Sequence, residues 1–172
     1  MIGTDYALLM RQLDPRLSID TILPALAQMA YFHCNEAYFS HRMLKMYSQT
    51  IQPRFNETDA LGHINNTVIA AWFEGCRDPL FRLFTPNLDP AQWRLILAKF
   101  SVEFHAELFY GEAVEIRTWV SRVGNSSFDV SQQAWQAGKH CASGVAVMVH
   151  YDFSVKQSAV LDETLKAQLL AL

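Results

Sequence analysis

The chain of 172 residues lacks the cysteine pattern of a disulfide-rich or zinc-binding protein. Its three cysteines, Cys34, Cys76 and Cys141, lie far apart and form no CxxC pair. Isolated cysteines in an odd number argue against a disulfide framework and favour a reducing compartment. The six histidines show no HxxxH spacing, so we expect no bound metal ion and no other cofactor.

Long apolar runs and an excess of positive charge are also missing. The most apolar early stretch, LSIDTILPALAQMAYF, is too short for a membrane span and is interrupted by Asp20, Pro24 and Gln28. The first residues lack the basic and apolar regions of a signal peptide, so we expect a cytoplasmic protein with no membrane partner. A formal net charge of -3 gives no sign of a general polyanion binder, and we expect no nucleic-acid partner.

A change of pattern near residue 47 divides the chain. Residues 1–46 contain helical stretches, but Pro15 and Pro24 interrupt them and no apolar stripe is sustained. We interpret them as a poorly defined N-terminal extension with some helical character, or as the product of an upstream start. Residues 47–172 are predicted to form one domain, because 51% hydrophobic and 18% charged residues are typical of a globular chain.

The domain is predicted to begin with a strand at residues 47–52, followed by a loop and a helix. A period of 3.6 residues places one set of apolar side chains on a single helix face: Ile69, Trp72, Phe73, Cys76, Leu80, Leu83 and Phe84. Pro79 cannot donate a backbone hydrogen bond, so we expect a kink or a break near Arg77 or Asp78.

After residue 94 the period changes to two, which predicts four strands joined by short turns. The first of them should turn one set of side chains to a common face: Ile96, Ala98, Phe100, Val102, Phe104, Ala106 and Leu108. Gly144 should mark a bulge or a close approach. The four strands are expected to form an antiparallel meander. The fold class is α+β, a hotdog fold in which about five antiparallel strands wrap around one long central helix.

Polar residues gather where the helix begins, in the stretch ETDALGHINN. Asn65 and Asn66 occupy the N-cap region, where the first backbone N–H groups lack acceptors and the helix dipole is positive. Such a helix start can stabilise a developing oxyanion, and Asp59 lies close enough to approach the same ligand. Gly62 gives the loop between them conformational freedom. The alternative is that Asp59 and Asn65 merely cap the loop and the helix.

ETDALGHINN followed by WFEGCR resembles the hotdog-fold acyl-CoA thioesterases of the 4-hydroxybenzoyl-CoA thioesterase-like family. The resemblance covers about residues 47–155 and implies that an acyl-CoA or acyl-ACP thioester is hydrolysed. It implies that Asp59 is the catalytic carboxylate, acting as nucleophile or general base. The backbone N–H near Asn66 would polarise the thioester carbonyl, and His63 would orient the loop or the water. Homodimers or homotetramers are implied as well.

Other positions are candidates for contacts with the substrate. Gly62 and Asn65 flank the catalytic positions, while Ile69 and Trp72 on the apolar helix face suit the core and an acyl pocket equally well. Arg122, Ser126 and Ser127 lie near a turn and are candidates for contacts with CoA phosphates. The simpler interpretation of these three is that they are solvated turn residues.

Two competing hypotheses stay open at this point. The first is hydration or dehydration of an acyl thioester by His63 together with Glu74, which lies off the apolar helix face. The second is a non-catalytic module that senses acyl-CoA and uses residues 1–46 to bind DNA or a partner. The balanced charges of that extension, together with Asp59, count against the second hypothesis.

Overall fold

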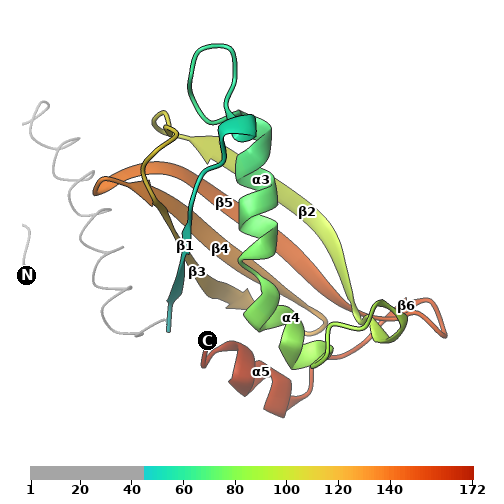
Figure 1. The fold of residues 1–172 in the computed structure, drawn as a ribbon. Coiled ribbons are helices and arrows are strands. Elements are labelled where there is room, and N and C mark those ends of the chain that lie inside the picture. Colours follow the sequence, from blue (N-terminus) through green and yellow to red (C-terminus); the bar gives the residue numbers. More distant parts are fainter. Residues whose placement is uncertain (1–44) are drawn as a thin grey trace, which may run out of the picture. The chain divides into compact units, whose positions relative to one another are not determined.

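The structure, a computed structural model, describes residues 45–172, so the predicted extension 1–46 lies almost entirely outside the described residues. The elements are β1 (Tyr47–Ile51), α3 (Asn66–Gly75), α4 (Asp78–Phe84), β2 (Leu95–Phe104), β3 (Val114–Val123), β4 (Ser127–Gln136), β5 (Lys139–Asp152), β6 (Gln157–Ser158) and α5 (Glu163–Leu169), with 3₁₀ turns at Phe55–Glu57 and Pro90–Gln92 (Figure 1). The division of the chain near residue 47 stays a prediction.

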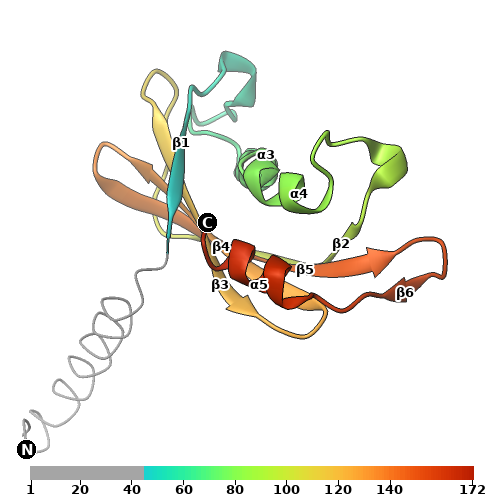
Figure 2. The ribbon, with the colours of Figure 1, turned by 90° about the horizontal axis from the view of Figure 1, so that it is seen from below.

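The strands form one antiparallel sheet in the order β1-β3-β4-β5-β2, to which the short β6 adds beside β5. The sheet is strongly curled, and α3 and α4 lie in its hollow (Figure 2). The predicted α+β hotdog fold is therefore confirmed. Within residues 45–172, every helix falls short of the length and apolar character that a membrane span needs.

The position of β2 differs from the predicted meander. Only β3, β4 and β5 follow one another across the sheet, whereas β2 lies at the edge beside β5. After β2 the chain crosses the start of α3, where the Leu108 carbonyl accepts a hydrogen bond from the Ile64 N–H (2.7 Å), and reaches β3 beside β1. Alternating apolar residues identify a strand but not its neighbours, so the prediction of a simple meander was wrong.

A β-bulge in β2 changes which side chains face the helices. Leu97 pairs with Met148 and Lys99 pairs with Val147, so Ala98 is the extra residue. The bulge reverses the alternation, and Leu95 is buried while Ile96 shares the outer face with its partner on β5. The predicted common face from residue 96 onward is therefore wrong at its first two members. The regular strand also ends at residue 104, four residues earlier than its apolar pattern suggested.

The predicted break in the central helix is confirmed, and the helix is two helices rather than one. Pro79 has no N–H to donate to the carbonyl four residues before it, and α3 ends at that residue, Gly75. Neighbouring side chains satisfy carbonyls near the break. The Gln132 amide donates to the Phe73 carbonyl (2.8 Å), and the Tyr47 hydroxyl donates to the Cys76 carbonyl (2.9 Å). These side chains fix where the helix bends.

Helix α3 lies very close to the sheet. A Cβ atom placed on Gly144 would lie 2.7 Å from two ring carbons of Phe73, a side chain that is fully buried. No register shift occurs at Gly144 itself. Of the two alternatives for this glycine, the close approach is the one realised, and it sets the spacing between helix and sheet.

Two groups of buried side chains form the core, one around each helix. The group at α3 includes Ile69, Phe73 and Leu108. The group at α4 includes Leu80 and Phe128, and it continues into α5 and the segment before it. Helix α5 therefore covers the α4 end of the core (Figure 1). The α3 end has no such cover within residues 45–172.

Candidate active site

Asp59 determines the shape of the loop before α3. Its Oδ1 atom accepts hydrogen bonds from the backbone N–H groups of Leu61 (2.8 Å) and His63 (3.1 Å). Gly62 has a φ angle of +83°, which glycine adopts at little cost. The loop-closing contacts anticipated for Asp59 are thus present. They use one carboxylate oxygen only, and Oδ2 has no hydrogen-bond partner within residues 45–172.

Asn65 is the N-cap of α3, as predicted. Its Oδ1 atom accepts hydrogen bonds from the backbone N–H (3.0 Å) and the hydroxyl (2.8 Å) of Thr67. The Val68 N–H is bound by the Asn65 carbonyl (2.9 Å). Asn66 is the first helical residue, and its N–H has no acceptor among residues 45–172. A donor without a partner therefore remains at the positive end of the helix.

The segment that crosses the helix start forms the opposite side of the site. The backbone of His63 bridges that of Phe109, and the His63 ring packs edge-on against the Phe109 ring at 5.3 Å between centroids. The Nε2 atom of His63 lies 3.9 Å from a carboxylate oxygen of Glu107. His63 is therefore fixed by its backbone, by an aromatic contact and by a nearby acid.

A groove of about 640 Å³ lies between the helix start and this crossing segment. One side is formed by residues of the loop and the helix: Asp59, His63, Ile64, Asn65, Asn66 and Ile69. The other side is formed by Phe104, His105, Ala106, Glu107, Leu108 and Lys139. Buried Ile64, Ile69 and Leu108 give it an apolar floor, and the polar atoms lie above that floor. Such a groove can hold the apolar part of a ligand while polar groups contact its reactive end.

Two predicted contact residues on or near α3 do not line the groove. Gly62 belongs to the same loop but turns the chain without forming the groove wall. Trp72 is buried, and its indole Nε1 donates to a carboxylate oxygen of Glu57 (3.1 Å). Of the two roles considered for Trp72, packing in the core is the one that its surroundings fit.

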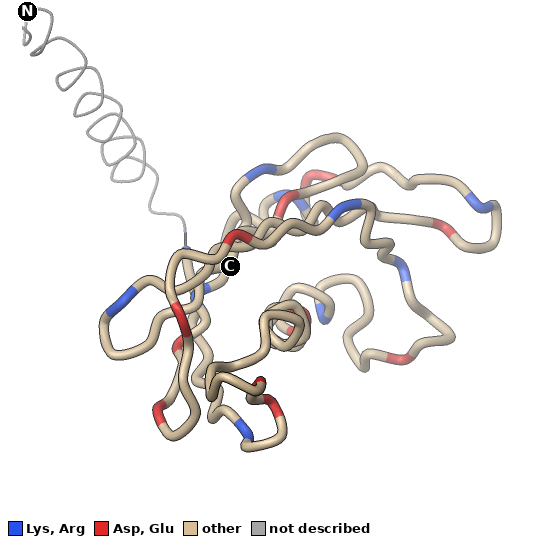
Figure 3. The backbone as a smooth tube through the Cα atoms, turned by 90° about the horizontal axis from the view of Figure 1, so that it is seen from above, with Lys and Arg blue, Asp and Glu red and all other residues tan. Residues whose placement is uncertain are grey.

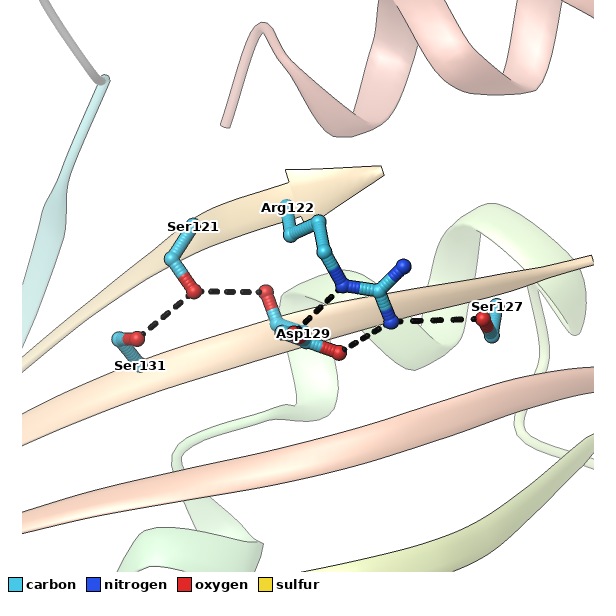
Figure 4. A network of polar contacts seen from close by, with 5 residues as sticks. All are labelled: Ser121, Arg122, Ser127, Asp129 and Ser131. Atoms are coloured by element: carbon cyan, nitrogen blue, oxygen red, sulfur yellow. Dashed lines mark hydrogen bonds and ion pairs between the residues drawn. The ribbon is translucent and has the colours of Figure 1, made fainter. Parts of the chain in front are cut away.

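Arg122, Ser126 and Ser127 lie at the other end of the sheet. Strand β3 starts near the groove, where Gln136 joins Val114 to the crossing segment, and it runs for ten residues to Val123. At about 3.3 Å per residue, roughly 30 Å separates its two ends. The Arg122 guanidinium binds both carboxylate oxygens of Asp129 (2.7 and 2.8 Å; Figure 4). These three residues therefore do not join the groove of their own chain.

Glu74 lines a different, smaller pocket of about 360 Å³ beside Arg77 and Asp78. Arg77 is buried, with its guanidinium over the rings of Phe100 and Phe81. Desolvation lowers the pKa of Arg77 from its ordinary value. Glu74 and His63 thus belong to separate pockets of one chain.

Nothing in the sequence indicates that the residues on the sheet side of the groove belong to the site. Phe104, His105 and Lys139 belong to β2, the segment after it and the start of β5. They meet the helix start because β2 pairs with β5, a non-local contact. Acidic and basic residues are otherwise interspersed along the described backbone, with no large patch of one sign (Figure 3).

A curled antiparallel sheet around a helix, with an acid and an unpaired helix N–H in one groove, defines a hotdog protein with a polar site at its helix start. Residues 53–169 match the model of the thioesterase-like superfamily. The match covers more than half of the chain, and the chain belongs to this superfamily.

Solved structures agree with this membership. A predicted thioesterase from Bacillus stearothermophilus is 34% identical, with a TM-score of 0.70 over 73% of this chain and 94% of that one. A Thermus thermophilus thioesterase complexed with coenzyme A and Zn is 22% identical, with a TM-score of 0.64 over 73% and 97%, and it shares the fold. The Bacillus subtilis protein YsmA, which is uncharacterised, is 28% identical over 58% of this chain and 68% of its own length. The superfamily and the Bacillus stearothermophilus structure support thioester hydrolysis in general.

Proposed function

We propose that this protein hydrolyses an acyl thioester, carried by coenzyme A or by an acyl carrier protein, to a free acid and a thiol. The observation that carries the proposal is that one groove contains both a carboxylate oxygen and a helix N–H that have no hydrogen-bond partner within residues 45–172. The Oδ2 atom of Asp59 can accept a proton or attack a carbonyl carbon, and the N–H of Asn66 can donate to a carbonyl oxygen. Membership of the thioesterase-like superfamily supports the same reaction class.

The proposed chemistry divides the work between these two groups. The thioester oxygen accepts a hydrogen bond from the Asn66 N–H, which stabilises the negative charge that develops on it. Asp59 either removes a proton from a water molecule that attacks the carbonyl carbon, or attacks that carbon itself to form an anhydride that water then hydrolyses. In both routes the C–S bond breaks, and the thiolate leaves and is protonated.

His63 has a supporting role in this proposal. Its backbone N–H binds Asp59, and its ring is held against Phe109, so it keeps the carboxylate at the mouth of the groove. The ring also lies near Glu107, with Nε2 3.9 Å from a carboxylate oxygen. Asn65 and Ile69 shape the start and the floor of the groove.

A homodimer or homotetramer belongs to the same proposal. Strand β2 is an edge of the sheet within residues 45–172, and it exposes Leu97 (44%) and Phe104 (53%). Unpaired strand edges with apolar side chains invite pairing with another strand. A second copy would cover this edge directly beside the groove, and light scattering coupled to gel filtration measures the assembly.

The hydratase alternative has less support. It needs His63 and Glu74 to act on one substrate, and the two residues line separate pockets of one chain. Interconversion of an enoyl-CoA and a hydroxyacyl-CoA by an Asp59→Asn variant would revive it.

The decisive experiment is a hydrolysis screen across short, long and aromatic acyl-CoA thioesters with Asp59→Asn as the control. Asparagine keeps an oxygen that can accept from Leu61 and His63, so the loop should keep its shape. We expect kcat/KM to fall by roughly 10²- to 10⁴-fold, the usual contribution of a general base, with an unchanged melting temperature. Full activity of Asp59→Asn would contradict the proposed mechanism.

A further inference from the structure

Two residues on the sheet side of the groove can carry positive charge. Lys139 is the first residue of β5, is exposed, and forms no ion pair within residues 45–172. His105 follows the end of β2 and is also exposed. Both line the groove opposite the helix start. The groove therefore has Asp59 at the helix side, and Lys139 and His105 at the sheet side, where Glu107 is the one acid among the described residues of the lining.

A hydrogen-bonded pair of side chains holds His105 in place. Its Nε2 atom lies 2.9 Å from the Ser143 hydroxyl oxygen, which in turn lies 3.0 Å from Nε2 of His140. The Ala142 carbonyl, which can only accept, lies 3.1 Å from the same His140 nitrogen. His140 Nε2 therefore carries a proton, and Ser143 is free to donate to His105. When it does, or when His105 is charged, Nδ1 of His105 carries an N–H donor.

His140 is a fixed support for the His105 ring. Its ring stacks on Trp135 at 4.9 Å with an interplanar angle of 18°, and it lies 4.7 Å from the His105 ring. Burial, and then the neighbouring His105 and Arg117, lower the pKa of His140, while its bond to the Ala142 carbonyl opposes that shift. Ser143 and His140, both on β5, thus contact His105, and Trp135 on β4 supports His140.

We propose that Lys139 and His105 bind the phosphate groups of the substrate's carrier, with Ser143 and His140 as positioning residues for His105. This rests on the proposed thioester hydrolysis, in which the carbonyl lies at Asn66. The flexible pantetheine arm separates the carbonyl from the phosphates, so the anionic end can leave the groove over its sheet-side rim. Asp59 repels that end from the helix side. The shared chemistry is a phosphate on a pantetheine arm, whether in coenzyme A or on an acyl carrier protein.

The site at residues 122–127, where the sequence placed phosphate contacts, offers less. The Arg122 guanidinium already binds both oxygens of Asp129, and it also contacts the Ser127 hydroxyl at 3.5 Å (Figure 4). A phosphate there would have to compete with a bidentate carboxylate. Lys139 has no such competitor within the described residues.

Binding and turnover of matched ligands test the proposal in the full-length protein. Calorimetry with coenzyme A, dephospho-coenzyme A, 4′-phosphopantetheine and pantetheine measures what each phosphate contributes to binding. Coenzyme A differs from dephospho-coenzyme A by the 3′-phosphate. Dephospho-coenzyme A carries the pyrophosphate, 4′-phosphopantetheine only the first phosphate, and pantetheine none. Lys139→Ala should weaken binding of at least one phosphorylated ligand about tenfold, the effect of losing one charge-assisted contact, and leave pantetheine unchanged. The effect should shrink at high salt. Lys156→Ala, another exposed lysine in a turn outside the groove, is the matched control.

The positioning role of Ser143 needs its own comparison. His105→Ala should raise KM for an acyl-CoA thioester severalfold at nearly constant kcat, and Ser143→Ala should give a smaller rise. Ser143→Thr, which keeps the hydroxyl, should have the KM of the unchanged protein. An equal loss for acyl-pantetheine, or a tenfold loss for Arg122→Ala instead of Lys139→Ala, would overturn the proposal. Because binding of free coenzyme A is measured separately, the phosphate site can fail or stand independently of hydrolysis.

Discussion

The two ends of the curled sheet differ in whether their polar groups have hydrogen-bond partners. At the α4 end, Leu161 and Leu169 are fully buried, α5 covers the core, and Arg122 and Asp129 satisfy each other. At the α3 end the groove is open, and the Asp59 Oδ2 atom and the Asn66 N–H have no partners within residues 45–172. Each end thus contains a loop, a helix and charged residues. The difference is that Arg122 and Asp129 bind each other at one end, whereas the Asp59 Oδ2 atom and the Asn66 N–H at the other end face a groove.

The largest expected effect is the contrast between the two acids at these ends. Asp59→Asn should reduce kcat/KM by roughly 10²- to 10⁴-fold without changing stability. Asp129→Asn breaks an exposed ion pair with Arg122, so it should lower the free energy of unfolding by less than about 1 kcal/mol and leave turnover unchanged. Steady-state kinetics and thermal melts of both variants make the test. An equal fall of kcat/KM in Asp59→Asn and Asp129→Asn would show that the two ends do not differ in their contribution to turnover.

Leu169 tests the closed end. It is fully buried in α5 against the α4 core, so Leu169→Ala should cost about 2–5 kcal/mol of unfolding free energy, measured by urea denaturation. The fraction that stays folded should keep its kcat/KM, because the groove is at the other end. Leu170→Ala, next to it but 37% exposed, should cost far less. Lost activity in folded Leu169→Ala protein would mean that α5 acts on the groove.

Gly144 tests the spacing on which both ends depend. The added methyl of Gly144→Ala would lie 2.7 Å from the Phe73 ring, so we expect a loss of about 1–3 kcal/mol as the helix shifts. Gly75→Ala, with open space around its Cβ position, should be neutral or slightly stabilising. Combining Gly144→Ala with Phe73→Leu should recover part of the loss, and strict additivity in this cycle would rule out a steric cause.

The last comparison concerns a thiol between the two ends, which has no expected role in turnover. Burial, then the charge of Asp78, raises the pKa of Cys76 from 9.0 to about 11 despite the opposing Arg77. A raised thiol pKa leaves fewer thiolate anions, so at pH 8 the thiolate fraction of Cys76 is roughly a hundredfold below that of an ordinary cysteine. Peptide mapping after brief alkylation should find Cys76 unmodified in the native protein and modified in urea. Rapid labelling of native Cys76 would mean that the α3–α4 break opens readily.

Local features of this fold could be predicted from the sequence, and non-local ones could not. Pro79 ends α3 through its own missing N–H, and Asn65 caps α3 with its own side chain, so neighbours in sequence were sufficient. The place of β2 beside β5 depends on how the chain crosses the helix start. That crossing also brings His105 to the groove, and the alternating pattern around residue 105 contains no sign of it.

The same distinction applies to the candidate site. The polar residues of the helix side lie within eight residues of sequence, from Asp59 to Asn66, and the sequence alone groups them as one candidate site. The chemical roles of those residues stay predictions until the variants are measured. The bulge at Ala98 shows that the core is also incompletely predictable from the sequence. One extra residue in β2 reverses which side chains face the helices, and strict alternation does not reveal it.

The segment that crosses the helix start has a practical consequence for changing what the protein accepts. It joins the edge strand β2 to β3 through residues 105–113, and it forms one wall of the groove without belonging to the regular ladder. Insertions or deletions there could widen or shorten the groove while the contacts between α3 and the sheet remain intact. Laboratory evolution of new substrate ranges could therefore begin with the length of this connection before altering any buried side chain.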